Sequence, residues 1–383
     1  MADGEKPYRI YKGGRSRGRV PLTPRPEKDQ RARAAQARTP GRPRWGRRIG
    51  ITLALLFLLL VVWVVISYLS FRTGVEAANA RLPGAVRAHL ARSEGPVISK
   101  PSLILLLGTD GDRTPIREDA RRSDSILIVR TDPRRHRLSY LSIPRDLRVD
   151  IPGHGPNKIN AAHQLGGPAL AIDTVKALTG LRVNHVMLVD FQDFRDVIDA
   201  VGGIEVDVPN RIISNNFDCP YDAARCREWQ GWRFDKGRQK MDGRRALIYS
   251  RIRENRLDPD ENDLTRGGRQ QEVVEALTDK LVGPSTFVRL PFIGDKLMTP
   301  LTTDLSANQL LQLGWVKFRA NSSRALHCRL GGEPQLIDGQ EVLIATEENT
   351  AAISMFTGHS AAQPPPPGAI YAAGCVIGNG RSG

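Results

Sequence analysis

Residues 139–146 read SYLSIPRD, an apolar run that ends abruptly in Pro, Arg and Asp. Short continuous apolar runs are typical of strands that are buried on both faces of a sheet. The repetition of such runs along the chain predicts a central sheet. The segment SYLSIPRD also raises the question of why a core strand should end in an Arg next to an Asp. Similar runs occur at residues 103–108 (LILLLG), 125–129 (SILIV) and 185–189 (HVMLV).

Segments with apolar residues at helical spacing alternate with these runs. The segment 191–201 has this spacing and is followed by a Gly pair, so we expect a helix there. Strands mixed with helices predict an α/β fold, specifically an α–β–α sandwich whose mixed central sheet is covered on both faces. We expect further helices at about residues 167–178, 265–282 and 306–318, and one within 241–253 that leads into an extended piece.

Gly267 and Gly268 lie inside the helix that is predicted at residues 265–282. Each glycine costs about 1 kcal/mol there relative to Ala. A close approach of the backbone to a ligand would explain the pair, and fraying near the start of the helix would explain it too.

The stretch 49–71 (IGITLALLFLLLVVWVVISYLSF) contains 23 residues and no charged side chain. About 20 apolar residues span the hydrocarbon core of a bilayer. Arginines precede the stretch, and Trp63 and Tyr68 lie toward its far end, where aromatic residues favour the membrane interface. We expect an uncleaved transmembrane helix with residues 1–48 in the cytoplasm and residues 72–383 outside. A cleaved signal peptide is the alternative, but its apolar region would be shorter.

The positive charge of the chain is concentrated before this helix. Residues 1–48 carry fifteen Lys or Arg and four acidic residues, which is +11 of the net charge of +15. The segment has few large apolar residues, so we expect a disordered basic tail. Contact with anionic headgroups on the cytoplasmic side of the membrane explains the charge better than binding to nucleic acid.

The four cysteines all follow the predicted transmembrane helix. An even number on the outer side of a membrane favours two disulfides. Three connectivities are possible; we favour Cys219 with Cys226 and Cys328 with Cys375, although the short spacing supports mainly the first pair. A zinc site is the weaker alternative, because no CxxC occurs and no His lies at ligand spacing from the first pair.

Polar side chains cluster where the predicted strands begin and end. Asp110 follows the first run, Arg122 and Asp124 precede the second, and Arg145 follows the third. Ligands of open α/β sheets bind at strand ends, the fork of Arg matches phosphate oxygens, and Asp carboxylates bind Mg²⁺. The combination predicts a site for a pyrophosphate and a metal ion. For Arg145 and Asp146 taken alone, a surface ion pair is the simpler interpretation.

A second set of candidate residues follows later in the chain. Arg251 and Arg253 alternate along a piece predicted to be extended, so they would share one face and repel each other unless an anion lay between them. Asp263, Arg266 and Gln270 come shortly afterwards. No HExxH, GxSxG or Walker A motif is present. The sequence therefore favours phosphate binding over hydrolysis by a zinc protease, a serine hydrolase or a P-loop enzyme.

These motifs, in this order, resemble the LytR–CpsA–Psr family of bacterial cell-envelope enzymes. The resemblance covers about residues 101–283, which we expect to form the catalytic domain, with a stalk at 72–100 and the C-terminal part of the ectodomain at 284–383. The similar blocks are LLLGTD (105–110), RRSDSILIV (121–129), LSIPRDLRVDIPG (141–153), NKINAAH (157–163), VDFQDFRDVIDAVGGIEVDVP (189–209), GRRALIYSRIR (243–253) and DLTRGGRQQEVVEAL (263–277).

The resemblance implies a phosphotransferase that moves a glycopolymer from a polyprenyl-pyrophosphate carrier onto peptidoglycan through a phosphodiester bond. Asp110 and Asp124 would hold Mg²⁺, with Mn²⁺ as the alternative, and Asp263 would lie near the acceptor or the metal. On general chemical grounds, a carboxylate, either Asp263 or Asp124, would take the proton of the acceptor hydroxyl. An apolar core between sheet and helices would take the prenyl chain. The pyrophosphate would be bound by Arg122, Arg145, Arg251, Arg253, Arg266 and Gln270.

Two features put parts of this assignment in doubt. Asp112 and Arg113 compete with Asp110 and Arg122 for their roles, and the insert at 219–234 would vary the acceptor side. A pyrophosphatase without a sugar acceptor, a non-enzymatic module that binds lipid-linked glycan, and a membrane-anchored DNA-binding regulator are the competing hypotheses. The high content of Arg, Ala and Gly is typical of an actinobacterium, and it does not identify the polymer.

Overall fold

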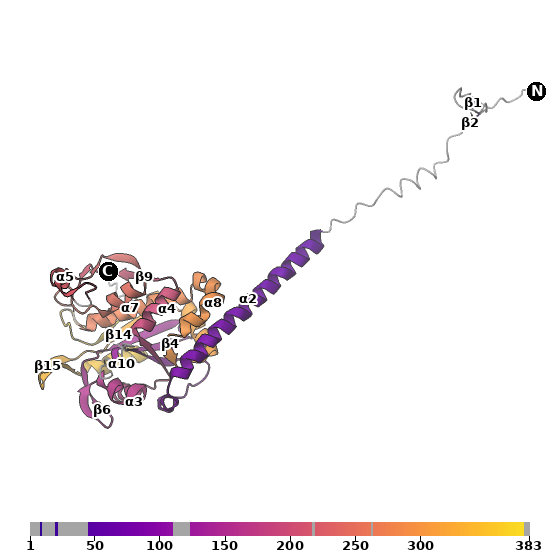
Figure 1. Ribbon diagram of the computed structural model, residues 1–383. Coiled ribbons are helices and arrows are strands. Elements are labelled where there is room, and N and C mark those ends of the chain that lie inside the picture. The colour runs from indigo at the N-terminus through magenta and orange to yellow at the C-terminus, as the bar shows by residue number, and fades with distance from the viewer. Residues whose placement is uncertain are drawn as a thin grey trace, which may run out of the picture. The chain divides into compact units, whose positions relative to one another are not determined.

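The computed structural model describes residues 8–9, 20–21, 45–109, 123–216, 219–261 and 263–378 (Figure 1). The chain divides into two compact units, residues 1–62 and 63–383. In the first unit, β1 (Tyr8–Arg9) pairs antiparallel with β2 (Val20–Pro21). Most of the basic tail lies outside the described residues, so its expected disorder stays a prediction.

Helix α2 (Trp45–Arg81) contains the predicted transmembrane segment. It is the one helix among the described residues that is long and apolar enough to cross a membrane, with a mean hydropathy of 3.1 over its most apolar window. This supports a single-pass membrane protein. The helix continues ten residues beyond Phe71 and ends just before Pro83 and Gly84.

Residues 72–100, which we expected to form a stalk, pack against the domain that follows. Val75 and Ala78 of α2 are fully buried, and Val75 lies in a cluster with residues of later helices. After α2, the short 3-10 helix η1 (Gly84–His89) buries Val86 in the main core. These buried side chains therefore make the segment part of the domain, and not a separate stalk between the domain and the membrane.

The central sheet of the second unit has seven strands in the order β13-β8-β3-β4-β5-β14-β17. Strands β8, β3, β5 and β14 run parallel to one another, whereas β4, β13 and β17 run antiparallel to their neighbours. The sheet is mixed, as predicted. The strands are β3 (Ser102–Thr109), β4 (Ser123–Asp132), β5 (Arg137–Ile143), β8 (His185–Asp190), β13 (Thr302–Thr303), β14 (Leu326–Arg329) and β17 (Gly374–Ile377).

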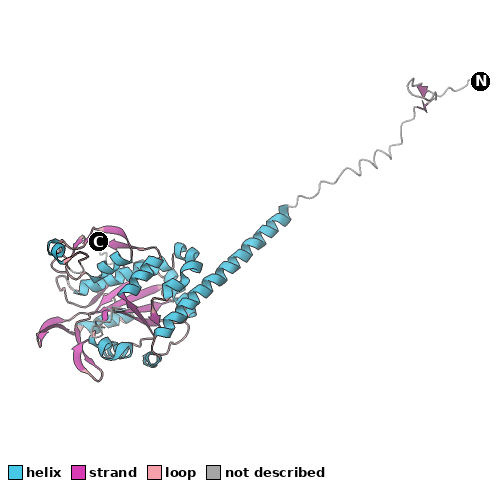
Figure 2. Cartoon of the chain, viewed as in Figure 1, coloured by secondary structure: helices cyan, strands magenta, loops and turns pink. Residues whose placement is uncertain are grey.

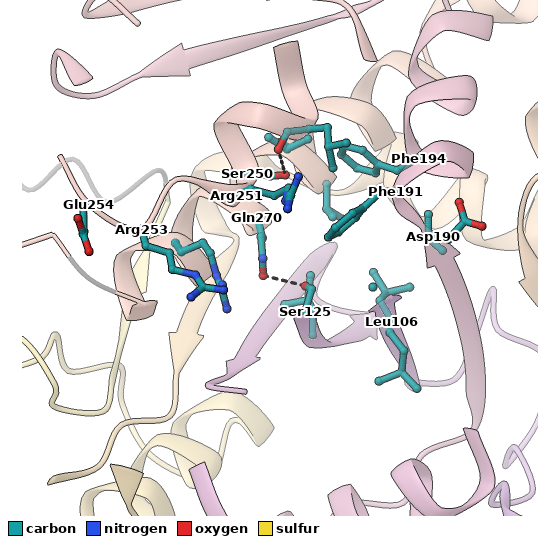
Figure 3. Close-up of a pocket in the computed structure, with 18 of the residues that line it drawn as sticks. Leu106, Ser125, Asp190, Phe191, Phe194, Ser250, Arg251, Arg253, Glu254 and Gln270 are labelled. Atoms are coloured by element: carbon teal, nitrogen blue, oxygen red, sulfur yellow. Dashed lines mark hydrogen bonds between the residues drawn. The ribbon is translucent and has the colours of Figure 1, made fainter. Parts of the chain in front are cut away.

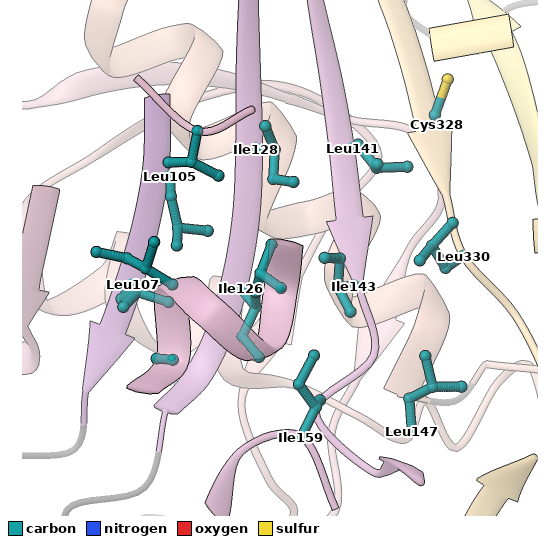
Figure 4. Packing of buried hydrophobic residues seen from close by; sticks show 14 of the residues in the cluster. Leu105, Leu107, Ile126, Ile128, Leu141, Ile143, Leu147, Ile159, Cys328 and Leu330 are labelled. Carbon is teal, nitrogen blue, oxygen red and sulfur yellow. The ribbon is translucent and has the colours of Figure 1, made fainter. Parts of the chain in front are cut away.

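Helices cover both faces of this sheet (Figure 2), which confirms the predicted α–β–α sandwich. On one face, Leu105 and Ile128 of the sheet pack with Ile172 of α3 and Phe356 of α10 (Figure 4). On the other face, Tyr140 packs in a separate cluster with residues of α7 and α9. The helices named on the first face are α3 (Ala161–Thr179) and α10 (Glu348–Thr357). The other longer helices are α4 (Phe191–Ala200), α6 (Gly243–Arg251), α7 (Asp263–Leu281), α8 (Pro284–Met298) and α9 (Ala307–Arg319).

The expected helices occur close to their predicted bounds because their ends carry local signals. Ser306 caps α9 in a reciprocal capping box with Gln309. Helix α4 is followed by Gly202 and Gly203, both in the left-handed region with φ of 83° and 86°, where glycine is favoured. The helices α8 and α10 were not predicted, although α8 begins with a Pro in its first turn and α10 is followed by Gly358 in the left-handed region.

Smaller elements surround the sandwich, and both predicted disulfides are present. Cys219 pairs with Cys226, and Cys328 of β14 pairs with Cys375 of β17. Because β13, β14 and β17 complete the central sheet, residues 284–383 form one sheet with residues 101–283. The smaller elements are β6 (Leu147–Ile151), β7 (Gly155–Lys158), β9 (Ile204–Val208), β10 (Ile212–Ile213), α5 (Ala223–Glu228), β11 (Arg233–Phe234), β12 (Gly237–Met241), η3 (Ser322–Arg324), β15 (Glu333–Ile337) and β16 (Gln340–Ile344).

Candidate functional site

The carboxyl ends of the four parallel strands meet at one edge of the central sheet. Thr109 at the end of β3 is aligned with Asp190 at the end of β8. Arg329 at the end of β14 is aligned with Ser142, one residue before the end of β5. This edge is where α/β sheets bind ligands. The SIPRD segment leaves the sheet here, so the structure places Arg145 at the edge where the candidate site was predicted.

Asp146 holds Arg145 in place, which answers the question that the segment raises. Its carboxylate contacts Nε of Arg145 at 3.3 Å and accepts a hydrogen bond of 2.8 Å from Nζ of Lys158. Burial alone would raise the pKa of Asp146, but the hydrogen bond from Lys158 and the positive charges of Arg145, Lys158 and Arg266 outweigh it and lower that pKa. Asp146 is therefore ionised at neutral pH and serves to orient the cations around it.

Arg266 and Gln270 are one helical turn apart on α7 and share a face. Both line a cavity of about 410 Å³ beside the sheet edge. Oγ of Ser125 in β4 donates a hydrogen bond of 2.7 Å to Oε1 of Gln270. Arg266 is only 5% exposed, so its charge acts in a region with little water. The prediction that these two residues lie near the site is consistent with this geometry.

Arg269 is equally buried but does not line this cavity. Its Nη1 contacts Oε2 of Glu261 at 2.6 Å, and its Nη2 donates to the backbone oxygen of Ile252. The same helix therefore carries one Arg that is used for packing, on a face distinct from that of Arg266.

Arg251 and Arg253 both line the cavity, but the reason given from the sequence was wrong. Arg251 is the last residue of α6 and not part of an extended segment, since the helix continues to that position. Its guanidinium lies over the ring of Phe191, with 4.5 Å from Cζ to the ring centroid. Arg253 follows in the loop after the buried Ile252. The two side chains reach the same cavity because the helix ends between them.

The cavity combines this cationic region with an apolar wall (Figure 3). In this view Arg253 and Gln270 lie on one side, and Leu106 and Phe194 lie on the other. Such a lining suits an amphiphilic molecule with an anionic head and an apolar chain. We refer to it as the arginine-lined cavity. The apolar residues of its lining are Leu106, Leu107, Leu127, Val189, Phe191, Phe194, Leu247, Val273 and Val274.

Four predicted site residues are described only in part or not at all. Asp110 and Arg122 lie outside the described residues, and only the backbone of Asp124 and Asp263 is described. The backbone of Asp124 is informative, because Gly108 pairs with Ser125 and Thr109 pairs with Ser123. This shift leaves Asp124 in a β-bulge at the sheet edge. Bulges often redirect a side chain next to an active site.

The predicted metal site can be tested only against the described residues. Among those residues, no group of three or more His, Cys, Asp or Glu side chains is placed to hold a metal ion. Mg²⁺ needs no such cage, since it is commonly bound through one or two carboxylates together with substrate phosphates. The bulge at Asp124 next to the arginine-lined cavity fits that mode of binding.

Three further residues at this edge were missed from the sequence. Asp190 and Ser125 line the arginine-lined cavity, and Arg329 joins the edge through β14. Ser125 lies within an apolar run and gave no signal of its own. Arg329 is separated from its neighbour β5 by more than 180 residues, and such long-range parallel pairing has no local signature.

Known proteins show the same sequence pattern and fold. The LytR_cpsA_psr family model matches residues 74–356. Over 275 residues, the chain is 31% identical to the Bacillus subtilis protein named polyisoprenyl-teichoic acid–peptidoglycan teichoic acid transferase TagV, covering 70% of this chain and 67% of the relative. Over 258 residues it is 32% identical to Staphylococcus aureus Regulatory protein MsrR, covering 67% of this chain and 70% of that relative.

Solved structures agree with this match. Bacillus subtilis TagV has a TM-score of 0.55 and 26% identity, covering 70% of this chain and 99% of TagV. A structure described as TagT bound to LI-WTA has a TM-score of 0.53 and 27% identity, covering 70% of this chain and 98% of TagT. The likeness therefore extends over nearly the whole of each solved chain.

Proposed function

This chain belongs to the LytR–CpsA–Psr family, and we propose that it transfers a glycopolymer from a polyprenyl-pyrophosphate carrier to peptidoglycan. The observation that carries the proposal is the arginine-lined cavity, in which an apolar wall meets Arg251, Arg253 and Arg266 at the carboxyl edge of the sheet. A pyrophosphate with a prenyl chain has the same two parts. The relative named as a polyisoprenyl-teichoic acid–peptidoglycan transferase supports this substrate class.

The proposed reaction is a phosphoryl transfer. An acceptor hydroxyl oxygen forms a bond to the phosphorus that carries the glycan, and the bond from that phosphorus to the bridging oxygen breaks. The products are a phosphodiester and a polyprenyl monophosphate, and the hydroxyl proton passes to a base. Such reactions depend on positioning and charge stabilisation more than on covalent catalysis.

The residues of this chain would supply most of that stabilisation. Arg145, oriented by Asp146, and Arg266 would bind the non-bridging oxygens, since guanidinium groups stabilise the charge that develops on the leaving phosphate. Mg²⁺, held by Asp124 and Asp110, would neutralise the same charge. Asp263 or Asp124 would accept the proton of the acceptor.

We further propose that the catalytic domain lies outside the cell. Arginines precede α2, and positively charged residues favour the cytoplasmic side of a transmembrane helix. Two disulfides after that helix fit an oxidising compartment. Cysteine-free reporter tags at either end of the chain, tested for protease accessibility in intact cells, would decide the orientation.

The transfer is tested with the full-length protein in detergent micelles, a short-chain polyprenyl-pyrophosphate glycan and peptidoglycan fragments. We expect a phosphodiester-linked product that requires peptidoglycan and is lost on chelation of divalent metal ions. Arg145→Ala should reduce the rate by about 100-fold, as removal of one donor to a developing anion does elsewhere. Lipid monophosphate released equally well without peptidoglycan would indicate a pyrophosphatase, and full activity of the Ala variant would refute the site.

A further inference from the structure

A second cavity, of about 450 Å³, lies against a different face of α7. Its lining alternates along the helix with that of the arginine-lined cavity: Leu264, Gly268 and Gln271 face it, whereas Arg266 and Gln270 face the other. The remaining wall comes from β14, β17 and residues 258–261 and 365–370. We call it the C-terminal cavity. None of the functions proposed above uses it.

A third, much smaller space shares lining residues with both cavities, and we call it the passage. It is a space of about 10 Å³ that is lined by Arg145, Arg266 and Arg329, among others. It shares Arg266 and Gln270 with the arginine-lined cavity and Leu264 and Arg329 with the C-terminal cavity. A volume of this size holds about one water molecule. Only a small group, such as a sugar hydroxymethyl, could reach Arg145 from this side.

Arg329 lines both the passage and the C-terminal cavity, and it has no acidic partner among the described residues. Its Nε donates a hydrogen bond of 3.0 Å to the backbone oxygen of Ala372, and among the described residues no carboxylate lies within salt-bridge distance of it. Burial lowers the pKa of the guanidinium, with no opposing charge to restore it. A half-buried cation that lacks a counter-charge is costly, and an anionic group of a ligand would offset that cost.

The outer wall of the C-terminal cavity is fixed to the sheet. The disulfide between Cys328 and Cys375 joins β14 to β17, and the amide of Cys375 donates to the backbone oxygen of Gln363 at 2.8 Å. A side chain at Gly374 would come within 2.6 Å of the backbone of Pro365, so this segment packs tightly. The cavity is therefore largely preformed, which reduces the ordering cost of binding.

We infer that the C-terminal cavity binds the acceptor, a peptidoglycan disaccharide-peptide, and that Arg329 pairs with a carboxylate of its stem peptide. This rests on the proposed function. The lining also contains Asp258 and Asp260, so the cavity offers carboxylates for the ammonium groups of the same peptide. The passage admits the sugar hydroxymethyl toward Arg145 and Arg266, where the phosphoryl group would be held from the opposite side of α7.

The test measures two binding equilibria on the full-length protein in detergent micelles by calorimetry. The probes are a soluble disaccharide-tetrapeptide of peptidoglycan and a short-chain polyprenyl pyrophosphate. We expect Arg329→Gln to weaken disaccharide-peptide binding at least tenfold and to leave polyprenyl pyrophosphate binding unchanged. Ala369→Trp, which fills the cavity from its outer wall without removing a charge, should have the same selectivity. Arg324→Gln, at an exposed position in η3, is the matched control and should alter neither.

The other outcomes overturn either the inference or the proposed function. Unchanged disaccharide-peptide binding in both variants would exclude this cavity, and a loss of polyprenyl pyrophosphate binding in Arg329→Gln would assign Arg329 to the carrier. Failure of the unaltered protein to bind the disaccharide-peptide would exclude an acceptor site there. Failure to bind polyprenyl pyrophosphate, with disaccharide-peptide binding intact, would instead count against the proposed function.

A separate observation concerns the exposed face of α8. Phe287, Val288 and Phe292 are 57%, 64% and 76% exposed, which is unusual for large apolar side chains that lie so close together. Helix α8 runs beside the outer end of the apolar segment of α2, with its first turn near Trp63 and Gly294 near Phe71. The ring of Trp63 lies 4.6 Å from that of Phe287, and a side chain at Gly294 would come within 2.8 Å of the backbone of Phe71.

The geometry points to the outer leaflet of the bilayer as the partner of this face. Residues 63–71 belong to the uncharged 23-residue stretch that is needed to span the hydrocarbon core. If those residues lie in the membrane, the turns of α8 packed against them reach the interface too, where aromatic side chains are favoured. The exposed side chains of α8 would then be inserted among lipids, as in interfacial helices.

Fluorescent labels at single introduced cysteines test this in full-length protein reconstituted into lipid nanodiscs. A label at Phe292→Cys should be quenched by nitroxide-bearing lipids and protected from iodide in solution. The control is Leu336→Cys, a residue of β15 that is 71% exposed, and its label should show the opposite pattern. Equal iodide quenching at the two positions would refute the membrane contact, and Val288→Cys provides a second position on the same face.

Discussion

Gly267→Ala and Gly268→Ala should change the stability of this protein in opposite directions, although the two residues are neighbours in α7. A Cβ atom at Gly267 would lie 2.4 Å from Oγ and 3.3 Å from Cβ of Ser142 in β5, whereas a Cβ at Gly268 meets nothing within 4 Å. The first glycine therefore lies at a close approach of helix to sheet, and the second does not.

The magnitudes follow from these contacts. Replacing a helical Gly by Ala stabilises by about 1 kcal/mol when no clash results, so Gly268→Ala should raise the free energy of unfolding by that amount. The same gain applies to Gly267→Ala, but crowding of a packed interior costs about 1–3 kcal/mol. Because the helix propensity is common to both variants, the difference between them isolates the cost of the contact with Ser142.

The assay is urea unfolding of the full-length protein in detergent micelles, followed by intrinsic fluorescence. We expect Gly267→Ala to be less stable than Gly268→Ala by about 1–3 kcal/mol. Adding Ser142→Ala to Gly267→Ala should recover a large part of the loss, since it removes the oxygen at 2.4 Å. Equal stabilities for the two glycine variants, within about 0.5 kcal/mol, would refute the packing explanation.

Other substitutions test separate parts of the structure. Asp146→Asn should lower stability at neutral pH by about 1.5–3 kcal/mol. The pKa of Asp146 is lowered in the folded protein, so its carboxylate contributes to the free energy of unfolding above the ordinary pKa of 3.8. In urea titrations the wild type should lose this contribution as pH falls below that value, and the Asn variant should show no such loss. Burial raises the pKa of Glu272 to about 7 from 4.5. The free energy of unfolding of the wild type should therefore fall by up to about 3 kcal/mol as pH rises across that range, and Glu272→Gln should flatten this dependence on pH. Replacing Cys328 and Cys375 by Ser opens a loop of 47 residues and should lower the free energy of unfolding by about 4 kcal/mol, as measured by thermal unfolding. The same replacement of Cys219 and Cys226, which close a shorter loop, should lower it by about 2 kcal/mol.

The sandwich could be predicted because its central strands are continuous apolar runs. Residues 103–108, 125–129 and 138–143 all lie within β3, β4 and β5, since a strand covered on both faces has no polar side to display. Edge strands lack this signal. β14 and β17 have mixed composition, and they are placed by a disulfide and by pairing with β5, which is distant in sequence.

The candidate site was predicted in part for a similar reason. Arg145, Arg266 and Gln270 lie in motifs whose residues are brought together by the strand order, and the structure places all three beside the sheet edge. The interpretation of Arg251 as part of an extended segment was wrong, because the helix α6 continues to that residue. Periodicity over three residues cannot distinguish the end of a helix from the start of an extended segment.

The position of α7 relates the two proposed substrates to each other. One face of the helix carries Arg266 into the arginine-lined cavity, and another face lines the C-terminal cavity through Gly268. Since Gly267 lets the helix approach β5 at Ser142, the same contact sets how near both faces lie to Arg145. A shift of α7 away from the sheet would widen the passage between the cavities and separate carrier phosphate from acceptor hydroxyl. Phosphoryl transfer depends on such positioning, so Gly267→Ala should lower the rate of transfer by more than its effect on the binding of either substrate.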